Sequence, residues 1–66
     1  MRQGEIREIN GYFVRKTTDT RFLNRDGYAK ACYKIYENMD DANGGGRKGC
    51  ISTCFNMKEV KECTKD

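Results

Sequence analysis

The sequence predicts a small α+β domain in which a β-hairpin and a third strand pack against one main helix, with a short helix at the C-terminus (ββαβα). Three observations lead to this order. Asn10-Gly11 stands between two apolar, β-branched segments, as in a β-hairpin. Residues 26–41 carry apolar side chains at helical spacing, and residues 49–55 form a β-branched segment behind a glycine-rich loop. The chain of 66 residues has room for one such domain, spanning 1–66.

The hairpin occupies the N-terminal part of the chain, with strands expected at 4–9 and 12–17. Asn-Gly is the preferred dipeptide for a two-residue type I′ turn, and this turn fixes the register. One face then pairs Ile9 with Tyr12, Arg7 with Val14 and Glu5 with Lys16, and the other pairs Glu8 with Phe13 and Ile6 with Arg15. One assignment buries the three apolar side chains of the first face, Ile9, Tyr12 and Val14, and leaves Phe13 partly exposed beside Arg15, whereas a β-bulge would reverse this assignment. The sequence leaves open which face of the hairpin is buried.

Residues 26–41 are predicted to form the main helix. Their apolar side chains recur every three or four residues, which places them on one stripe of a helix. The stripe consists of Tyr28, Ala31, Cys32, Ile35 and Met39, with Tyr36 at its edge. Asn24 or Asp26 can cap the N-terminus, and Asn43 with Gly44 can end the helix in a left-handed conformation.

A third strand at 49–55 and a C-terminal helix at 57–64 complete the order. The strand segment is rich in β-branched residues and cysteine. Asn56 and Glu59 have the spacing of a capping box, which marks the start of a helix. A main helix that returns across the sheet would bring the third strand parallel to the second. The right-handed crossover then places it beside the first strand.

Composition and charge limit the functional classes. The net charge is +3, because residues 1–36 hold eight basic and four acidic side chains and residues 37–66 hold five and six. This modest basic bias can attract phosphates or an acidic partner. The N-terminal segment lacks the apolar stretch of a signal peptide, and no run is long enough to span a membrane. We therefore expect a cytoplasmic protein without membrane contact, or a secreted one if Met1 was added for expression.

The glycine-rich segment at 44–50, GGGRKGC, invites comparison with a phosphate-binding P-loop. Gly44 and Gly49 have the glycine spacing of that motif, but a P-loop continues with Lys and then Ser or Thr, and it joins a strand to a helix. Here Cys50 and Ile51 follow Gly49, and the predicted order is helix, loop, strand. A mobile linker that leads into the strand is the simpler interpretation.

The four cysteines are spaced C-x17-C-x3-C-x8-C, and the chain has no histidine. In a strand, Cys50 and Cys54 would lie on one face with Cα atoms about 13 Å apart, too far for one disulfide or a shared zinc ion. No metal site is therefore expected. Under oxidising conditions Cys32 can pair with Cys50 and Cys54 with Cys63. In a reducing compartment all four would be buried thiols.

Catalysis is not expected from this sequence. The chain has no histidine to act as a base near neutral pH, and its serine and cysteine residues stand in no motif that would activate a nucleophile. No motif places a pair of carboxylates for acid-base chemistry, and no cofactor is expected.

A small protein that docks on another protein agrees best with these features, because that role needs only a stable scaffold and an exposed patch. The candidate partner-binding residues lie on the hairpin and on the predicted main helix: Ile6, Phe13, Arg15 and Tyr33. Tyrosine and arginine are frequent interface anchors. The exposed second strand of the hairpin can also pair with a partner strand, or with a second copy of the chain in a homodimer.

Two alternative functions follow from other features. A basic, aromatic hairpin can bind nucleic acid by phosphate pairing and base stacking, and its residues for that role are Arg7, Tyr12, Phe13, Arg15 and Lys16. The interleaved Glu5 and Glu8 would repel a phosphate backbone. An even cysteine count in a short chain also suits a secreted, disulfide-stapled inhibitor or toxin, with a framework of Cys32, Cys50, Cys54 and Cys63.

Overall fold

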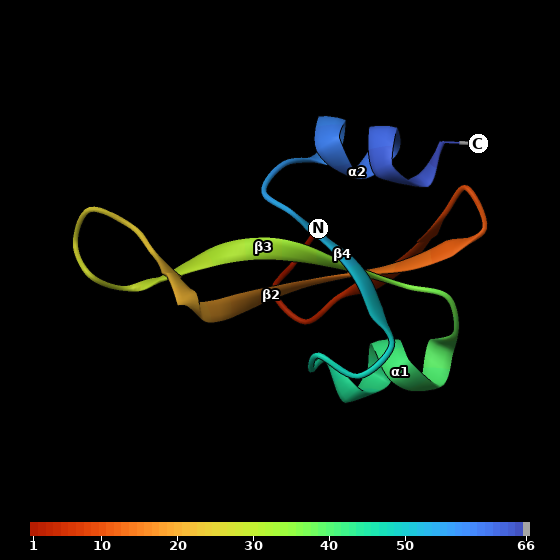
Figure 1. Cartoon of the computed structure of the whole chain (residues 1–66), viewed down its shortest axis with the longest axis horizontal. Coiled ribbons are helices and arrows are strands. Elements are labelled where there is room, and N and C mark those ends of the chain that lie inside the picture. The colour runs from red at the N-terminus through yellow and green to blue at the C-terminus, as the bar shows by residue number, and fades with distance from the viewer. Residues whose placement is uncertain (66) are drawn as a thin grey trace.

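The computed structural model describes residues 1–65, which form one four-stranded antiparallel sheet and two helices (Figure 1). In chain order the elements are β1 (Ile6–Ile9), β2 (Tyr12–Leu23), β3 (Ala29–Tyr36), α1 (Met39–Gly44), β4 (Cys50–Cys54) and α2 (Met57–Thr64). The strands lie side by side in the order β1-β2-β3-β4. The predicted α+β class is confirmed.

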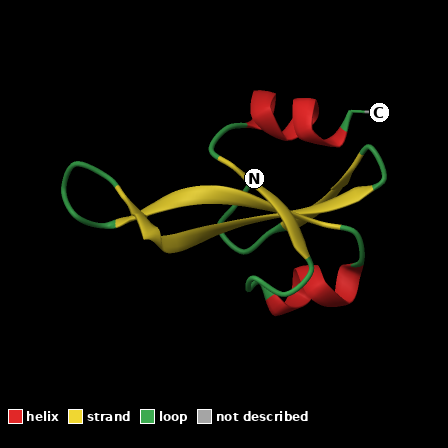
Figure 2. Ribbon diagram, in the orientation of Figure 1, coloured by secondary structure: helices red, strands yellow, loops and turns green. Residues whose placement is uncertain are grey.

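The two helices cover opposite faces of the sheet, so the fold has three layers (Figure 2). The face under α2 holds the main apolar core, formed by Val14, Ile35, Cys54 and Val60. The face under α1 buries the side chains of Cys32, Tyr36 and Ala42. A strand in the middle of such a sheet can bury side chains on both of its faces.

β1 and β2 form the predicted hairpin. Asn10 and Gly11 have φ angles of 52° and 87°, as a type I′ turn requires. The register pairs Ile9 with Tyr12, Glu8 with Phe13, Arg7 with Val14 and Ile6 with Arg15, as predicted. Val14 is fully buried, and Ile9 and Tyr12 pack against the core. Of the two assignments that the sequence left open, the structure has the one in which Ile9, Tyr12 and Val14 face the core.

The prediction of a main helix at residues 26–41 is wrong. This segment contains β3, and only the short helix α1 begins near its end. β3 lies between β2 and β4, and its last residues are buried on both faces. Lys34 and Tyr36 lie on the α1 face, whereas Ile35 belongs to the core under α2. Because burial on both faces removes the two-residue alternation of a strand, the apolar pattern of β3 resembles that of a helix.

The apolar side chains of the predicted helical stripe therefore do not share one surface. Its members Cys32, Ile35 and Tyr36 are fully buried, whereas Met39 and Tyr28 are 44% and 72% exposed. A strand followed by a turn and a short helix separates these side chains, which a continuous helix would have aligned.

A turn at residues 24–28 joins β2 to β3. The Asn24 side chain accepts hydrogen bonds from the backbone N–H groups of Asp26 at 2.9 Å and Tyr28 at 3.1 Å, and Gly27 has a φ angle of 83°. Asn24 therefore stabilises a hairpin turn. Short polar side chains favour both helix N-caps and such turns, which explains the mistaken helix start.

β4 and α2 lie close to the segments predicted for them, 49–55 and 57–64. The Asn56 side chain accepts a hydrogen bond from the Glu59 N–H at 2.8 Å. The Glu59 carboxylate accepts one from the N–H of Phe55, the residue before the cap, at 3.2 Å, so the arrangement is close to a capping box. The Asn38 side chain caps α1 in the same way. Both helices therefore start with local capping directly after a strand.

β4 pairs antiparallel with β3, at the edge of the sheet opposite to β1. The expected position of this strand beside the first strand is therefore wrong, because the β2–β3 hairpin leaves β3 as its neighbour. The expectation that the second strand, β2, has an exposed edge is also wrong for part of its length. It pairs with β1 over residues 12–15 and with β3 from residue 13 onward, so only its outer part has an open side.

Candidate functional site

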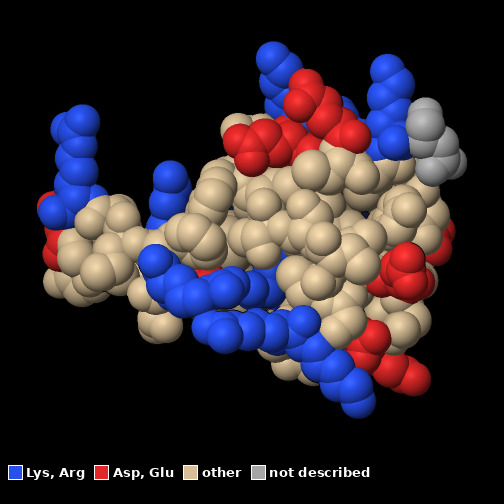
Figure 3. Space-filling model, viewed as in Figure 1, with Lys and Arg blue, Asp and Glu red and all other residues tan. Residues whose placement is uncertain are grey.

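A basic pocket lies on the α1 side of the sheet, where β2, β3 and β4 meet the loop that precedes β4. Its volume is about 290 Å³. The pocket is lined by Arg21, Lys34, Arg47, Cys50, Ile51, Ser52 and Thr53. Figure 3 shows several Lys and Arg side chains side by side across the front of the molecule. This concentration of positive charge makes the pocket the first candidate for a binding site.

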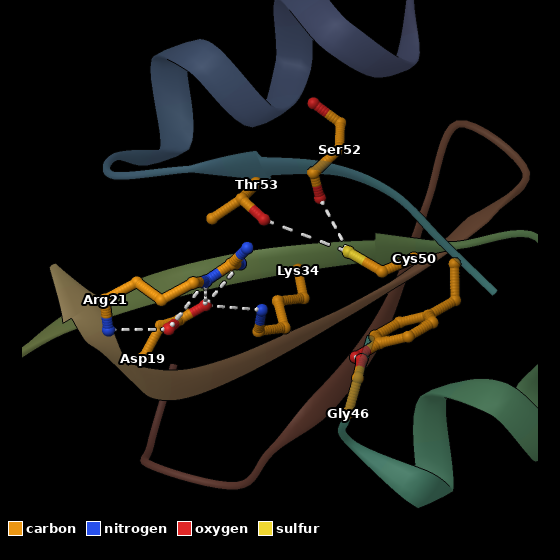
Figure 4. Close-up of polar contacts among 8 residues, drawn as sticks. Asp19, Arg21, Lys34, Gly46, Cys50, Ser52 and Thr53 are labelled. Carbon is orange, nitrogen blue, oxygen red and sulfur yellow. Dashed lines mark hydrogen bonds and ion pairs between the residues drawn. The ribbon is translucent and has the colours of Figure 1, made fainter. Parts of the chain in front are cut away.

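Asp19 holds two of the pocket's cations in place. One of its oxygens lies 3.0 Å from Lys34 Nζ, and the carboxylate accepts hydrogen bonds from Arg21 Nε at 3.0 and 3.1 Å (Figure 4). A terminal nitrogen of Arg21 donates to it at 2.6 Å and the Arg21 backbone N–H at 2.9 Å. These hydrogen bonds from Arg21, followed by that from Lys34, hold the pKa of Asp19 well below its usual range. Asp19 is therefore ionised at neutral pH and compensates the buried Lys34 ammonium.

A β-bulge brings Asp19 and Arg21 together. The register of β2 with β3 shifts between Asp19, which pairs with Lys30, and Leu23, which pairs with Ala29. Extra residues in a bulge bend the strand and redirect its side chains. Arg21 lies inside this irregular stretch, and its guanidinium folds back onto the Asp19 carboxylate.

The third cation, Arg47, lies on the glycine-rich loop between α1 and β4. The helix-loop-strand order is the predicted one and differs from that of a P-loop. The buried Tyr36 hydroxyl donates to the Gly46 carbonyl oxygen at 2.6 Å, and the Cys50 N–H donates to the Arg47 carbonyl oxygen at 3.1 Å. Burial raises the pKa of Tyr36 to about 12, so the hydroxyl keeps the proton that it donates. These contacts fasten the loop to the sheet, whereas the sequence alone favours a mobile linker.

The four cysteines are free thiols in the structure. Cys54 Sγ on β4 and Cys63 Sγ on α2 lie 3.3 Å apart, and they are one of the two pairs predicted to form a disulfide. Cys50 lines the pocket, where its thiol donates to the Ser52 carbonyl oxygen at 3.2 Å (Figure 4). Cys32 is fully buried, and burial raises the pKa of its thiol. The pairing of Cys32 with Cys50 stays a prediction.

The expected placement of Cys50 and Cys54 on one face of the strand is wrong. Cys50 lies opposite Tyr36 on the α1 face, and Cys54 lies opposite Tyr33 in the core under α2. The register shifts between these two pairs, which leaves Ile51 as the extra residue of a bulge. One extra residue reverses the alternation of side chains, so one thiol reaches the pocket and the other reaches the core.

The structure does not bring the predicted partner-binding residues into one patch. Ile6, Phe13 and Arg15 share the α1 face of the sheet, whereas Tyr33 lies on the α2 face beside the core. A terminal nitrogen of Arg15 donates to two carbonyl oxygens at the end of α1, at 3.0 and 2.8 Å. Arg15 therefore caps the C-terminal end of this short helix.

The residues of the predicted nucleic-acid surface also divide between the two faces. Arg7, Tyr12 and Lys16 lie on the α2 face, whereas Phe13 and Arg15 lie on the α1 face. Arg7 forms an ion pair of 2.9 Å with the carboxylate of Glu5. The hairpin of β1 and β2 therefore offers no single basic, aromatic surface.

The end of the β2–β3 hairpin forms a second surface of interest. This hairpin extends past the paired parts of β1 and β4 as a two-stranded ribbon (Figure 1). Leu23 and Tyr28, on the two sides of its turn, are 59% and 72% exposed. The helix predicted at 26–41 assigned Tyr28 to the core, so sequence reasoning missed this surface.

Sequence reasoning also missed the pocket. The pocket combines three separate segments of the chain, which contain Asp19 with Arg21, Lys34 and Arg47, and these segments meet only through the sheet register and the bulge. The one local signal is the Asp19-x-Arg21 spacing, which by itself is too common to indicate a site.

No protein-family description, no curated protein and no solved structure matches the chain. Within residues 1–65, no group of three or more His, Cys, Asp or Glu side chains is placed to hold a metal ion. Neither of the two helices has the length and apolar character needed to cross a membrane. We therefore argue function from the chemistry of the pocket and of the hairpin.

Proposed function

We propose that the protein is a non-enzymatic binding protein that docks on another protein through the end of the β2–β3 hairpin. The exposure of Leu23 and Tyr28 on both sides of the turn carries this proposal. Covering such apolar side chains removes them from water, which favours association. Tyrosine is also among the residues that most often anchor interfaces. The ribbon reaches beyond the layers of the sheet and helices, where a partner has access to both of its strands (Figure 1).

The charges around the hairpin end indicate the chemistry of the partner. Arg25, Asp26 and Lys30 are all exposed, so the turn carries two cations and one carboxylate. Lys30 Nζ lies 4.7 Å from the centre of the Phe55 ring, which supports the base of the ribbon against the start of α2. A partner surface with an apolar slot beside acidic side chains would complement this end of the molecule.

Serine substitutions at both exposed positions test the proposal. The tagged protein and its variant Leu23→Ser/Tyr28→Ser are used to capture partners from an extract of the cells that make the protein. Loss of a hot-spot contact of ~2 kcal/mol should weaken capture by about 30-fold. The matched control is Met39→Ser, which removes an apolar side chain that is 44% exposed and lies outside both the hairpin and the pocket. Equal capture by the double variant and the control would contradict docking through the hairpin.

Nucleic-acid binding is the second candidate, and the three exposed cations Arg21, Arg47 and Lys48 favour it. Phosphate contacts would make the affinity for DNA or RNA fall steeply as salt rises. A salt series with single- and double-stranded oligonucleotides measures this slope. An absence of binding at low salt would remove the candidate.

The proposal places the protein in the cytosol, where cysteines remain thiols. The intact mass of freshly purified protein, after treatment with a thiol-blocking reagent, tests the point. Four blocked thiols are expected, and two disulfides would favour the secreted inhibitor instead.

Self-association through an edge strand is a further form of protein binding. β4 is an edge of the sheet and can accept another strand on its outer side. Analytical ultracentrifugation over a concentration series distinguishes a homodimer from a monomer. A monomer at all concentrations would leave the hairpin end as the docking surface.

A further inference from the structure

We propose that the basic pocket binds a dianionic phosphate group, carried by free phosphate or by a small phosphate monoester. The site is separate from the apolar end of the hairpin, and the proposal does not depend on docking of a protein partner. It rests on the charge of the pocket, on its available hydrogen-bond donors and on its size.

The charge of the pocket is the first argument. Arg21, Lys34 and Arg47 line it, and Asp19 lies behind the first two. Three cations and one carboxylate leave a net charge of +2. Asp19 therefore orients its two partners without neutralising the site, and the excess charge matches that of a phosphate dianion.

Available donors are the second argument. Arg21 uses Nε and one terminal nitrogen for Asp19, which leaves its other terminal nitrogen for a ligand. Within residues 1–65 the Arg47 side chain makes no hydrogen bond or ion pair, and this arginine is exposed at the rim of the pocket. Thr53, which lies opposite Lys34 on the α1 face, adds a hydroxyl group on the β4 side. Guanidinium groups and hydroxyls are the usual partners of phosphate oxygens.

The construction of the pocket is the third argument. Lys34 is only 4% exposed and is fixed by Asp19, so the inner cation is in place before a ligand arrives. The outer cation, Arg47, sits on a loop that Tyr36 anchors through Gly46. A volume of about 290 Å³ accommodates a phosphate group with a small substituent, at the lower end of the usual range for ligand pockets.

Calorimetric titration with three probes tests the proposal at constant ionic strength and at about pH 8.5, where inorganic phosphate and a phosphate monoester are both dianions. The probes are inorganic phosphate, phenyl phosphate and the monoanionic diester diethyl phosphate. We expect the first two to bind and the diester to bind at least about tenfold more weakly, because it lacks one charge and one terminal acceptor oxygen. Tighter binding of phenyl phosphate than of inorganic phosphate identifies a monoester as the ligand. The reverse order identifies free phosphate.

Arg47→Ala and Lys48→Ala form a matched pair of variants. They remove the same charge from adjacent exposed positions, but only Arg47 lines the pocket. Arg47→Ala should weaken phosphate binding by about tenfold or more, the usual effect of losing a charge-assisted hydrogen bond, and Lys48→Ala should change it by less than about twofold. Absence of binding to both phosphate probes would overturn the proposal. Equal effects of the two variants would overturn it as well, because general attraction to a basic surface would then account for the binding.

Discussion

Mild oxidation of the protein should join Cys54 to Cys63 and raise its stability. The two sulfur atoms lie 3.3 Å apart, on adjacent elements that already pack together. Burial raises the pKa of the Cys54 thiol, whereas Cys63 is exposed. An oxidant or a small disulfide therefore reaches Cys63 first, and Cys54 then closes the bond.

The size of the effect follows from the loop that this bond closes. The two cysteines are nine positions apart, and closure of a loop of about ten residues removes ~9 cal/mol/K of entropy from the unfolded chain. This corresponds to about 2.7 kcal/mol at 25 °C. For a domain of this size the midpoint of thermal unfolding should rise by roughly 10 to 20 °C.

Urea unfolding of the oxidised protein, with and without reductant, measures this difference. Peptide mapping after thiol blocking identifies the bond, and Cys63→Ser serves as the control that should show no dependence on reductant. An unchanged midpoint after oxidation would refute the reasoning. So would a map that joins Cys63 to Cys32 or Cys50, because α2 would then lie differently on the sheet.

Three further substitutions test the pocket and its loop. Tyr36→Phe should lower the free energy of unfolding by about 1 kcal/mol through loss of its hydrogen bond. Burial raises the pKa of Tyr36 to about 12, so wild type should also lose stability as pH rises from about 10 towards 12. Urea unfolding at high pH should show a smaller loss for the variant, in which the buried thiols Cys32 and Cys54 still have a raised pKa. Hydrogen bonds from Arg21 lower the pKa of Asp19, so the ionised carboxylate stabilises the folded protein above about pH 4, and this stabilisation is lost as pH falls. The free energy of unfolding of Asp19→Asn, measured over the acid range, should therefore depend less on pH than that of wild type. Gly49→Ala places a methyl group against the Asp41 carboxylate at a φ angle of 74°, and it should lower the urea midpoint by an amount equivalent to about 1 to 2 kcal/mol or more. An unchanged midpoint for Gly49→Ala would contradict the described path of the loop.

Local signals in the sequence are sufficient for the parts of the fold that depend on neighbouring residues. Asn10-Gly11 specifies the first hairpin because the turn needs two residues with positive φ, which these two readily adopt. Asn56 specifies the start of α2 through a hydrogen bond three residues along the chain. In both places the information lies within a few positions.

β3 and α1 could not be predicted in the same way. β3 buries side chains on both faces because α1 and α2 cover the sheet on opposite sides, and the apolar pattern within β3 does not report that arrangement. α1 has a capping pattern at Asn38 and Asp41 similar to that of α2, but the apolar spacing across 26–41 obscured it. The single sequence therefore indicates the class of the fold more securely than its order of elements.

The candidate site is even harder to predict from local sequence patterns. A bulge determines that Arg21 meets Asp19, and the pairing of β2 with β3 determines that both lie near Lys34. Arg15 illustrates the converse, since its charge suggests a binding residue although its guanidinium caps α1. Register and bulges decide which charged side chains are free for a ligand.

Site-specific photo-crosslinking tests the central claim, docking through the end of the β2–β3 hairpin, most directly. A photoreactive phenylalanine analogue is placed at Tyr28 in one form of the protein and at Met39, which is 44% exposed outside the hairpin and the pocket, in another. Both forms are irradiated in the cells that make the protein. We predict a discrete protein adduct from position 28 and little or none from position 39. Adducts only from position 39, or equal yields from both positions, would contradict docking through the hairpin.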